Sequence, residues 1–134
     1  MPQNLRLALA QINTTVGDLS ANLKLITEYI RKAEDIQADI IAFPELAITG
    51  YPPEDLLLKP KFITDNLECL KNLVPFVKDT LAIVGFVDRK GNGLYNSAAV
   101  IYQKKIAGIY HKMFLPNYGV FDEKRYFKNG ANPA

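Results

Sequence analysis

Two short apolar runs on either side of one amphipathic stretch constrain the fold of this chain more than any other feature. The runs are residues 6–13, RLALAQIN, and 38–43, ADIIAF, and each is typical of a strand that is covered on both faces of a sheet. Between them, apolar residues recur at steps of three and four, which predicts a helix capped by Asp18 or Ser20. A strand, a helix and a strand within about 40 residues indicate a βαβ unit and hence a layered α/β fold.

The second buried run is followed by a long proline-rich segment. Residues 44–60 predict an ordered loop with one helical turn at 54–58, and long loops in compact domains are often functional. Residues 61–77 then place apolar side chains on one side, which predicts a second helix. Asn66 is the polar exception on that side, and Pro75 is expected to end or kink the helix.

The last part of the chain predicts three consecutive strands joined by hairpin connections. Strands are expected at 81–88, 94–103 and 106–112, with connections at 89–93 and 104–105. After Phe114 no helix or strand periodicity remains, and the final residues are turn-like. Two helices and five strands leave at least one sheet face short of cover. We therefore expect the chain to be the N-terminal part of a larger fold.

The composition excludes several classes of protein and of site. The 134 residues are 49% hydrophobic with a net charge of +2, which argues against disorder and against a nucleic-acid or acidic-membrane surface. One cysteine, Cys69, and one histidine, His111, exclude an internal disulfide framework, a cysteine zinc cluster and a His-rich metal site. No apolar run approaches the ~20 residues of a membrane span, and the first residues do not resemble a signal peptide. A cytoplasmic protein is therefore expected.

Three charged residues lie where a layered α/β fold could use them for chemistry. Glu45 follows a buried strand and Pro44, at the rim where such folds place their sites. Lys112 ends the last expected strand beside bulky apolar residues, where an ammonium could stabilise an oxyanion. Glu123 lies in the run VFDEKRYF. Taken alone, each has a plainer interpretation: a solvated acid in a loop, a surface lysine and an exposed charged turn.

Four other side chains have both functional and structural interpretations. Tyr118 and Phe121 could line a small pocket or simply pack under their loop. His111 should point to the strand face opposite Lys112, as a packing or hydrogen-bonding residue rather than a base. Cys69 is expected in the middle of the second helix beside an acid, with neither the cationic neighbours nor the helix N-terminus that activate a thiol. We expect it to be a partly buried structural thiol.

Four runs together resemble the nitrilase, or carbon–nitrogen hydrolase, superfamily. They are LALAQIN (7–13), DIIAFPELAITGYPPEDLL (39–57), GLYNSAAVI (93–101) and YHKMFLPNYGVFDEKRYF (110–127). Their order and spacing agree with the superfamily over nearly the whole chain. The Gly-Tyr-Pro-Pro-Glu-Asp stretch and the last two runs are most similar to one branch, the glutaminase domains of glutamine-dependent NAD synthetases.

The resemblance implies roles for particular residues. Members use a Glu–Lys–Cys triad, in which Glu45 corresponds to the general base and Lys112 to the residue that stabilises the tetrahedral intermediate. Glu123 falls where the family often has an assisting glutamate, and Tyr118 where this branch contacts glutamine. None of the 22 residues after Lys112 is a cysteine, although the family nucleophile follows the lysine. Cys69 precedes the lysine and cannot be carried over, so the nucleophile is expected outside this chain.

The resemblance also implies a fold and partners. Members form a four-layer αββα sandwich, so both helices are expected to cover one face of one sheet. Residues 1–134 are expected to be part of a carbon–nitrogen hydrolase domain. The substrate would be glutamine, and ATP and magnesium would act only in a synthetase domain that is absent here. No cofactor or metal is expected in this chain. Exposed apolar surface should favour self-association into a homo-oligomer or binding of a partner chain.

Two other functions remain open on the sequence. The chain could belong to a stand-alone nitrilase-type amidase, which the presence or absence of a synthetase domain in the parent protein would decide. It could also be a non-catalytic scaffold or interaction fragment, as the missing nucleophile suggests. A refolded monomer that binds no glutamine would support that last interpretation.

Overall fold

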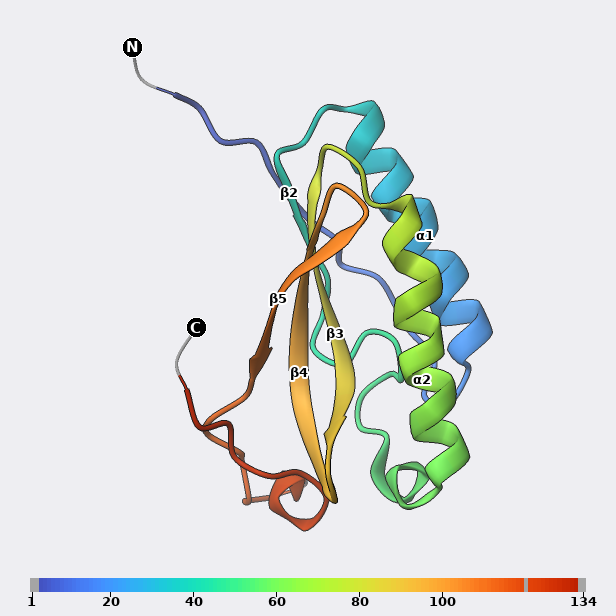
Figure 1. Cartoon of the computed structure of the whole chain (residues 1–134), viewed down its shortest axis with the longest axis vertical. Coiled ribbons are helices and arrows are strands. Elements are labelled where there is room, and N and C mark those ends of the chain that lie inside the picture. The colour runs from blue at the N-terminus through green and yellow to red at the C-terminus, as the bar shows by residue number, and fades with distance from the viewer. Residues whose placement is uncertain (1–2, 120, 133–134) are drawn as a thin grey trace.

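A computed structural model describes residues 3–119 and 121–132 as one sheet covered by helices on one side (Figure 1). The elements, in chain order, are β1 (Leu7–Leu9), α1 (Leu19–Asp35), β2 (Ile40–Ala42), η1 (Glu54–Leu58), α2 (Pro60–Leu73), η2 (Val74–Phe76), β3 (Leu81–Lys90), β4 (Gly93–Tyr102), β5 (Lys105–His111) and η3 (Glu123–Arg125). The strand order is β1-β2-β3-β4-β5. Strands β1, β2 and β3 are parallel, whereas β4 and β5 continue as an antiparallel meander.

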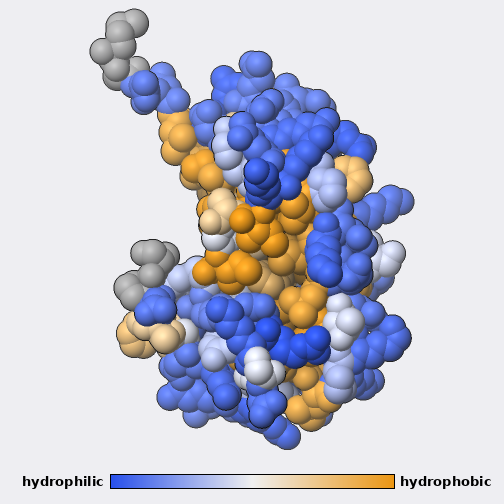
Figure 2. All heavy atoms as spheres, viewed as in Figure 1, coloured by the Kyte–Doolittle hydropathy of each residue, from blue (hydrophilic) through white to orange (hydrophobic). Residues whose placement is uncertain are grey.

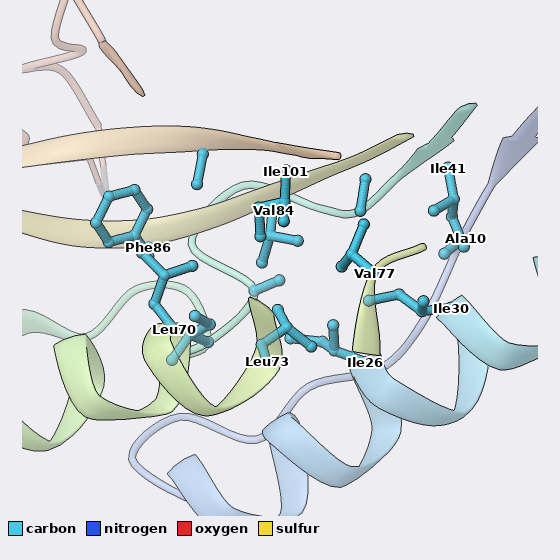
Figure 3. Close-up of a cluster of buried hydrophobic side chains, with 14 of the residues drawn as sticks. Ala10, Ile26, Ile30, Ile41, Leu70, Leu73, Val77, Val84, Phe86 and Ile101 are labelled. Carbon is cyan, nitrogen blue, oxygen red and sulfur yellow. The ribbon is translucent and has the colours of Figure 1, made fainter. Parts of the chain in front are cut away.

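Both helices cover the same face of the sheet, as expected. Figure 3 shows Ile26 and Ile30 of α1 and Leu70 and Leu73 of α2 turned toward the sheet. They meet apolar side chains that alternate along the strands, among them Phe86 of β3, in one buried cluster. Because each helix is apolar on one side only, this single layer of contacts buries both apolar stripes.

The first two strands differ from expectation on their second face. Leu7 and Leu9 of β1 are 53% and 70% exposed, so the expectation that this strand is covered on both faces is wrong. Strand β2 is also partly exposed at its two ends. Figure 2 shows apolar side chains along the N-terminal segment and over the strands in the middle of the view, whereas the helix side is mostly hydrophilic. The physical reason is that α1 and α2 lie on one face of the sheet, and no helix of the described residues packs against the other face of β1.

Several boundaries are corrected by local chemistry. Helix α2 ends at Leu73, and Pro75 lies in a 3-10 turn rather than in the last helical turn expected up to residue 77. The second hairpin turn is Gln103–Lys104, one residue earlier than expected, and both residues have positive φ, of 48° and 60°. The C-terminal segment, expected to lack regular structure, contains the 3-10 turn η3. No helix within the described residues is long and apolar enough to cross a membrane.

Asn66, the polar exception in α2, closes the edge of β3 beyond the point where β2 ends. Its side chain is buried, donates to the carbonyl of Val87 at 2.6 Å and accepts from the Val87 amide at 3.1 Å. A strand edge without a neighbour leaves backbone groups unpaired, which is costly inside a core. The asparagine therefore replaces the missing strand at one position.

Candidate active site

Glu45 reaches the middle of the sheet because the loop after β2 crosses β3 at a glycine. The carbonyl of Gly85 accepts from the Ile48 amide at 3.2 Å, so the loop is bonded to the strand it crosses. A Cβ atom at Gly85 would lie 2.3 Å from the Leu46 nitrogen and 2.9 Å from the Pro44 oxygen. Only a residue without a side chain allows so close an approach of two backbones.

Lys112 follows β5 and continues its pairing with β4. Its amide donates to the carbonyl of Asn96 at 2.8 Å, and its own carbonyl accepts from the Gly130 amide at 2.8 Å. His111 lies on the opposite strand face, as expected, with Nε2 at 2.7 Å from Oδ2 of Asp88. The Lys112 backbone is thus fixed by hydrogen bonds to Asn96 and Gly130, independently of the contacts of its side chain.

Glu123 is a buried acid that the 3-10 turn η3 carries back to the sheet. Its amide donates to the carbonyl of Pro116 at 3.2 Å, and its carbonyl accepts from the Phe127 amide at 2.8 Å. The residue is only 5% exposed. The expectation of an exposed charged turn taken from its neighbours is therefore wrong for Glu123, and a buried acid requires partners.

The three predicted ionisable residues converge on one point. Nζ of Lys112 lies 2.6 Å from Oε1 of Glu45 and 3.2 Å from each carboxylate oxygen of Glu123. Two carboxylates therefore share one ammonium. These distances place Glu45, Lys112 and Glu123 in one cluster, whereas the chemical role of each residue is a separate question.

Two further residues complete the cluster, and neither was singled out from the sequence. The side-chain amide of Asn96 donates to Oε1 of Glu45 at 2.5 Å and to Oε1 of Glu123 at 3.1 Å. The hydroxyl of Tyr51 donates to Oε2 of Glu123 at 2.8 Å. The position of Asn96 within a strand, where asparagine is disfavoured, was the one sequence signal that could have found it.

The charges of the cluster shift the ionisation of its members. Burial alone would lower the pKa of the Lys112 ammonium, but the hydrogen bonds to Glu45 and Glu123 and the charges of both outweigh it and raise the pKa. Burial, the bond to Glu123 and nearby negative charge raise the pKa of the Tyr51 hydroxyl. Lys112 therefore remains a cation, and Tyr51 a neutral donor, at neutral pH.

Two hollows adjoin the cluster. One, of about 210 Å³, lies on the open sheet face and is lined by Glu45 and Lys112 together with apolar side chains such as Ile83 and Tyr110. The other, of about 230 Å³, lies between the 51–57 loop and the C-terminal segment and is bounded by Glu123. The first hollow gives a small molecule access to both members of the Glu45–Lys112 pair.

The structure places the two aromatic candidates differently. Phe121 lines the second hollow, and its ring centroid is 6.4 Å from that of Tyr51. Tyr118 is 72% exposed and contacts Phe121 edge to face at 5.7 Å between centroids. Phe121 thus lies beside the site, and Tyr118 packs on the side chain of Phe121. The contact of either residue with substrate stays a prediction.

Cys69 lies away from this cluster. It is half-buried on α2 and packs against the core on the helix-covered side of the sheet. Burial, followed by the charges of Asp65 and Glu68, raises the pKa of its thiol. The expectation that this thiol is partly buried is confirmed, and its lack of reactivity stays a prediction.

The sequence matches one family model and several known proteins along almost its whole length. The family model described as carbon-nitrogen hydrolase matches residues 6–133. A glutamine-dependent NAD(+) synthetase from Thermotoga maritima is 45% identical over 130 residues, which are 96% of this chain and 22% of that protein.

Solved structures of glutamine-dependent NAD(+) synthetases have a similar fold over almost the whole chain. A glutamine-dependent NAD(+) synthetase from Cytophaga hutchinsonii has a TM-score of 0.90 and 30% identity, over 93% of this chain and 22% of its own. The Acinetobacter baumannii enzyme, solved with ADP, has a TM-score of 0.85 and 39% identity, over 96% of this chain and 24% of its own. The chain thus spans less than a quarter of the length of these relatives.

Proposed function

Because the chain belongs to the carbon–nitrogen hydrolase family, we propose that it supplies the general base and the oxyanion-stabilising cation of a glutaminase site. The ammonia released there would serve the ATP-dependent amidation of deamido-NAD to NAD. The observation that carries the proposal is the contact of Lys112 with Glu45 at 2.6 Å, beside an open hollow. Similarity to glutamine-dependent NAD(+) synthetases along almost the whole chain supports the choice of glutamine.

The chemistry assigns one step to each charged residue. A cysteine thiol supplied from outside residues 1–134 gives its proton to the Glu45 carboxylate, and the thiolate attacks the carboxamide carbon of glutamine. Lys112 stabilises the negative charge that develops on the carbonyl oxygen. The tetrahedral intermediate collapses as the nitrogen takes that proton from Glu45 and leaves as ammonia. Water then hydrolyses the thioester to glutamate and regenerates the thiol.

Glu123 has a supporting part in this scheme. Its carboxylate is buried and bonded to Lys112, Asn96 and Tyr51, so it is a second anionic partner that holds the ammonium in place. Phe121 and Tyr118 would contact the substrate near the second hollow. ATP and magnesium would be bound by a separate synthetase domain, and no step at this site passes through them.

The test uses the full-length natural polypeptide that contains these 134 residues. Glutamate release from glutamine should fall by about 10³-fold or more in Glu45→Gln and in Lys112→Ala, since members of one catalytic unit lose function together. NAD formation from added ammonia should be retained, because a different domain would perform it. Variants that hydrolyse glutamine at the parent rate would contradict the assignment.

The isolated 134-residue chain provides a second test. It should release no glutamate from glutamine, because Cys69 is its only cysteine and packs on the helix-covered side. Turnover that disappears in Cys69→Ser would show that the nucleophile is misplaced. Turnover that survives Cys69→Ser would remove cysteine catalysis from the mechanism.

A further inference from the structure

Asn96 contacts all three charged members of the site. We propose that Asn96 is a positioning residue, whose amide holds Glu45 and Glu123 around Lys112 and leaves one oxygen of Glu45 for proton transfer. The inference rests on the proposed glutaminase function and adds to it a residue that does not itself react.

The position of Asn96 is unusual for a strand residue. It lies inside β4, is 3% exposed, and shares the open sheet face with apolar neighbours such as Ala98 and Val100. Asparagine is disfavoured in strands, and a buried amide costs free energy unless it is hydrogen-bonded. A polar side chain at this place therefore needs a reason, which its two carboxylate partners supply.

The geometry of the amide fits two acceptors. Nδ2 of Asn96 lies 2.5 Å from Oε1 of Glu45 and 3.1 Å from Oε1 of Glu123. Its two hydrogens diverge, so one is available for each carboxylate. If the amide were turned around, its oxygen would face the two carboxylate oxygens. All three atoms are acceptors, so no hydrogen bond could form.

The hydrogen bond from Asn96 makes the two carboxylate oxygens of Glu45 different. Oε1 of Glu45 accepts from both Asn96 and Lys112, whereas Oε2 has no hydrogen-bond partner among residues 3–119 and 121–132. A general base needs one free oxygen within reach of the proton that it takes. Asn96 thus anchors the carboxylate through the oxygen that does not react.

The backbone of Asn96 extends this control to Lys112. Its carbonyl accepts from the Lys112 amide at 2.8 Å, so one residue sets the position of the lysine backbone and of both carboxylates. Other side chains of similar size would fail in distinct ways. Aspartate would place a third negative charge against the two glutamates, and leucine would remove both donors.

The experiment compares Asn96→Leu and Asn96→Asp with the parent in the full-length polypeptide, by glutamate release across pH. Each variant should lose about 10²-fold in kcat with little change in KM, as for a misplaced catalytic group. The acid limb of kcat/KM should move to higher pH, and further in Asn96→Asp, because the Glu45 carboxylate loses a donor and gains a like charge. Val100→Ala is the matched control: Val100 lies on the same face of β4 but is not among the described residues that line the hollow, so rate and profile should be unchanged.

The outcomes separate the two proposals. Suppose that the parent hydrolyses glutamine and that both Asn96 variants keep the parental kcat and the parental acid limb of kcat/KM. This result would overturn the positioning role of Asn96 and leave the proposed function standing. If the Asn96 variants and Val100→Ala all lose rate equally at every pH, the positioning role would also be overturned in favour of a structural role. If the parent itself has no glutaminase activity, the proposed function fails. A crystal structure of the Asn96→Leu polypeptide then decides, since unmoved Glu45 and Glu123 carboxylates would refute the role and displaced ones support it.

Discussion

The Lys112 ammonium and the Glu45 carboxylate meet at 2.6 Å although 67 positions separate the two residues in the sequence. The strands that precede them, β5 and β2, are not neighbours in the sheet, because β3 and β4 lie between. The contact forms because the loop after β2 crosses β3 at Gly85 and so carries Glu45 toward β4 and β5. The site is therefore a product of that crossing as much as of the charged residues.

Removing the ammonium should destabilise the domain through Glu123. In Lys112→Met, the buried Glu123 carboxylate loses its cation and, among the described residues, keeps two neutral side-chain donors, Asn96 and Tyr51. We expect a loss of about 2 kcal/mol of local stability, measured by hydrogen exchange of the β4 and β5 amides.

The double variant Lys112→Met/Glu123→Gln serves as the control for that loss. With the buried charge removed as well, most of the protection of the amides should return. Faster exchange in the double variant than in Lys112→Met would contradict the explanation by an unpaired charge.

The order of elements and the charged triad could be predicted from the sequence, but the polar residues that connect the triad could not. Apolar periodicity is local, so it indicated both helices and the three-strand meander. Glu45, Lys112 and Glu123 were singled out by their positions along the chain, and the family motifs then connected them to one another. Asn96 and Gly85 act through contacts between distant segments, which no local pattern contains. The exposed face of β1 was missed because an apolar run indicates burial without saying which segment covers it.

Cys69 should be an unreactive thiol. It is half-buried, and burial with Asp65 and Glu68 raises its pKa, so little thiolate exists near neutral pH. Alkylation followed by mass spectrometry should label Cys69 more slowly than a free cysteine in a model peptide. Cys69→Ser should leave the glutaminase activity of the full-length polypeptide unchanged. Rapid labelling of Cys69 together with loss of that activity would contradict both expectations.

Asn66 should contribute to stability and not to catalysis. Asn66→Ala removes both bonds to the Val87 backbone and leaves a buried donor and a buried acceptor unpaired. The expected cost is about 2–4 kcal/mol, visible as faster hydrogen exchange in β3 and a lower melting temperature. Asn72→Ala, an exposed asparagine on the same helix, is the control and should have little effect. Equal effects of the two substitutions would exclude the proposed closure of the β3 edge.

The Tyr51 hydroxyl should make the domain less stable in alkali. Its pKa is raised in the folded protein by burial and by Glu123, above the ordinary value of about 10 that applies when unfolded. A group of this kind stabilises the fold below its unfolded pKa, and the stabilisation is lost as pH rises through the folded pKa. The melting temperature should thus fall above about pH 10. The fall should be less steep in Tyr51→Phe, which has no hydroxyl to ionise, and equal slopes would contradict this origin.

Gly85 should be necessary to the site although it carries no side chain. A methyl group there would meet the backbone of Pro44 and Leu46, at 2.9 Å from an oxygen and 2.3 Å from a nitrogen. Backbone cannot rotate away as a flexible side chain can, so Gly85→Ala should push the loop off β3 and separate Glu45 from Lys112. We expect a loss of glutaminase activity of about 10²-fold or more, because a displacement of a catalytic group by about 1 Å can cost that much in rate.

Gly108→Ala provides the matched control for that substitution. Gly108 lies in β5, and a Cβ atom there has no described neighbour within 4 Å. The same change of glycine to alanine in a strand should therefore leave activity near the parent level and stability equal or slightly higher, since glycine weakens a strand interior. A Gly85→Ala enzyme as active as Gly108→Ala would show that the loop can carry Glu45 to Lys112 without close contact at β3. A crystal structure of Gly85→Ala would then reveal the alternative path of the loop.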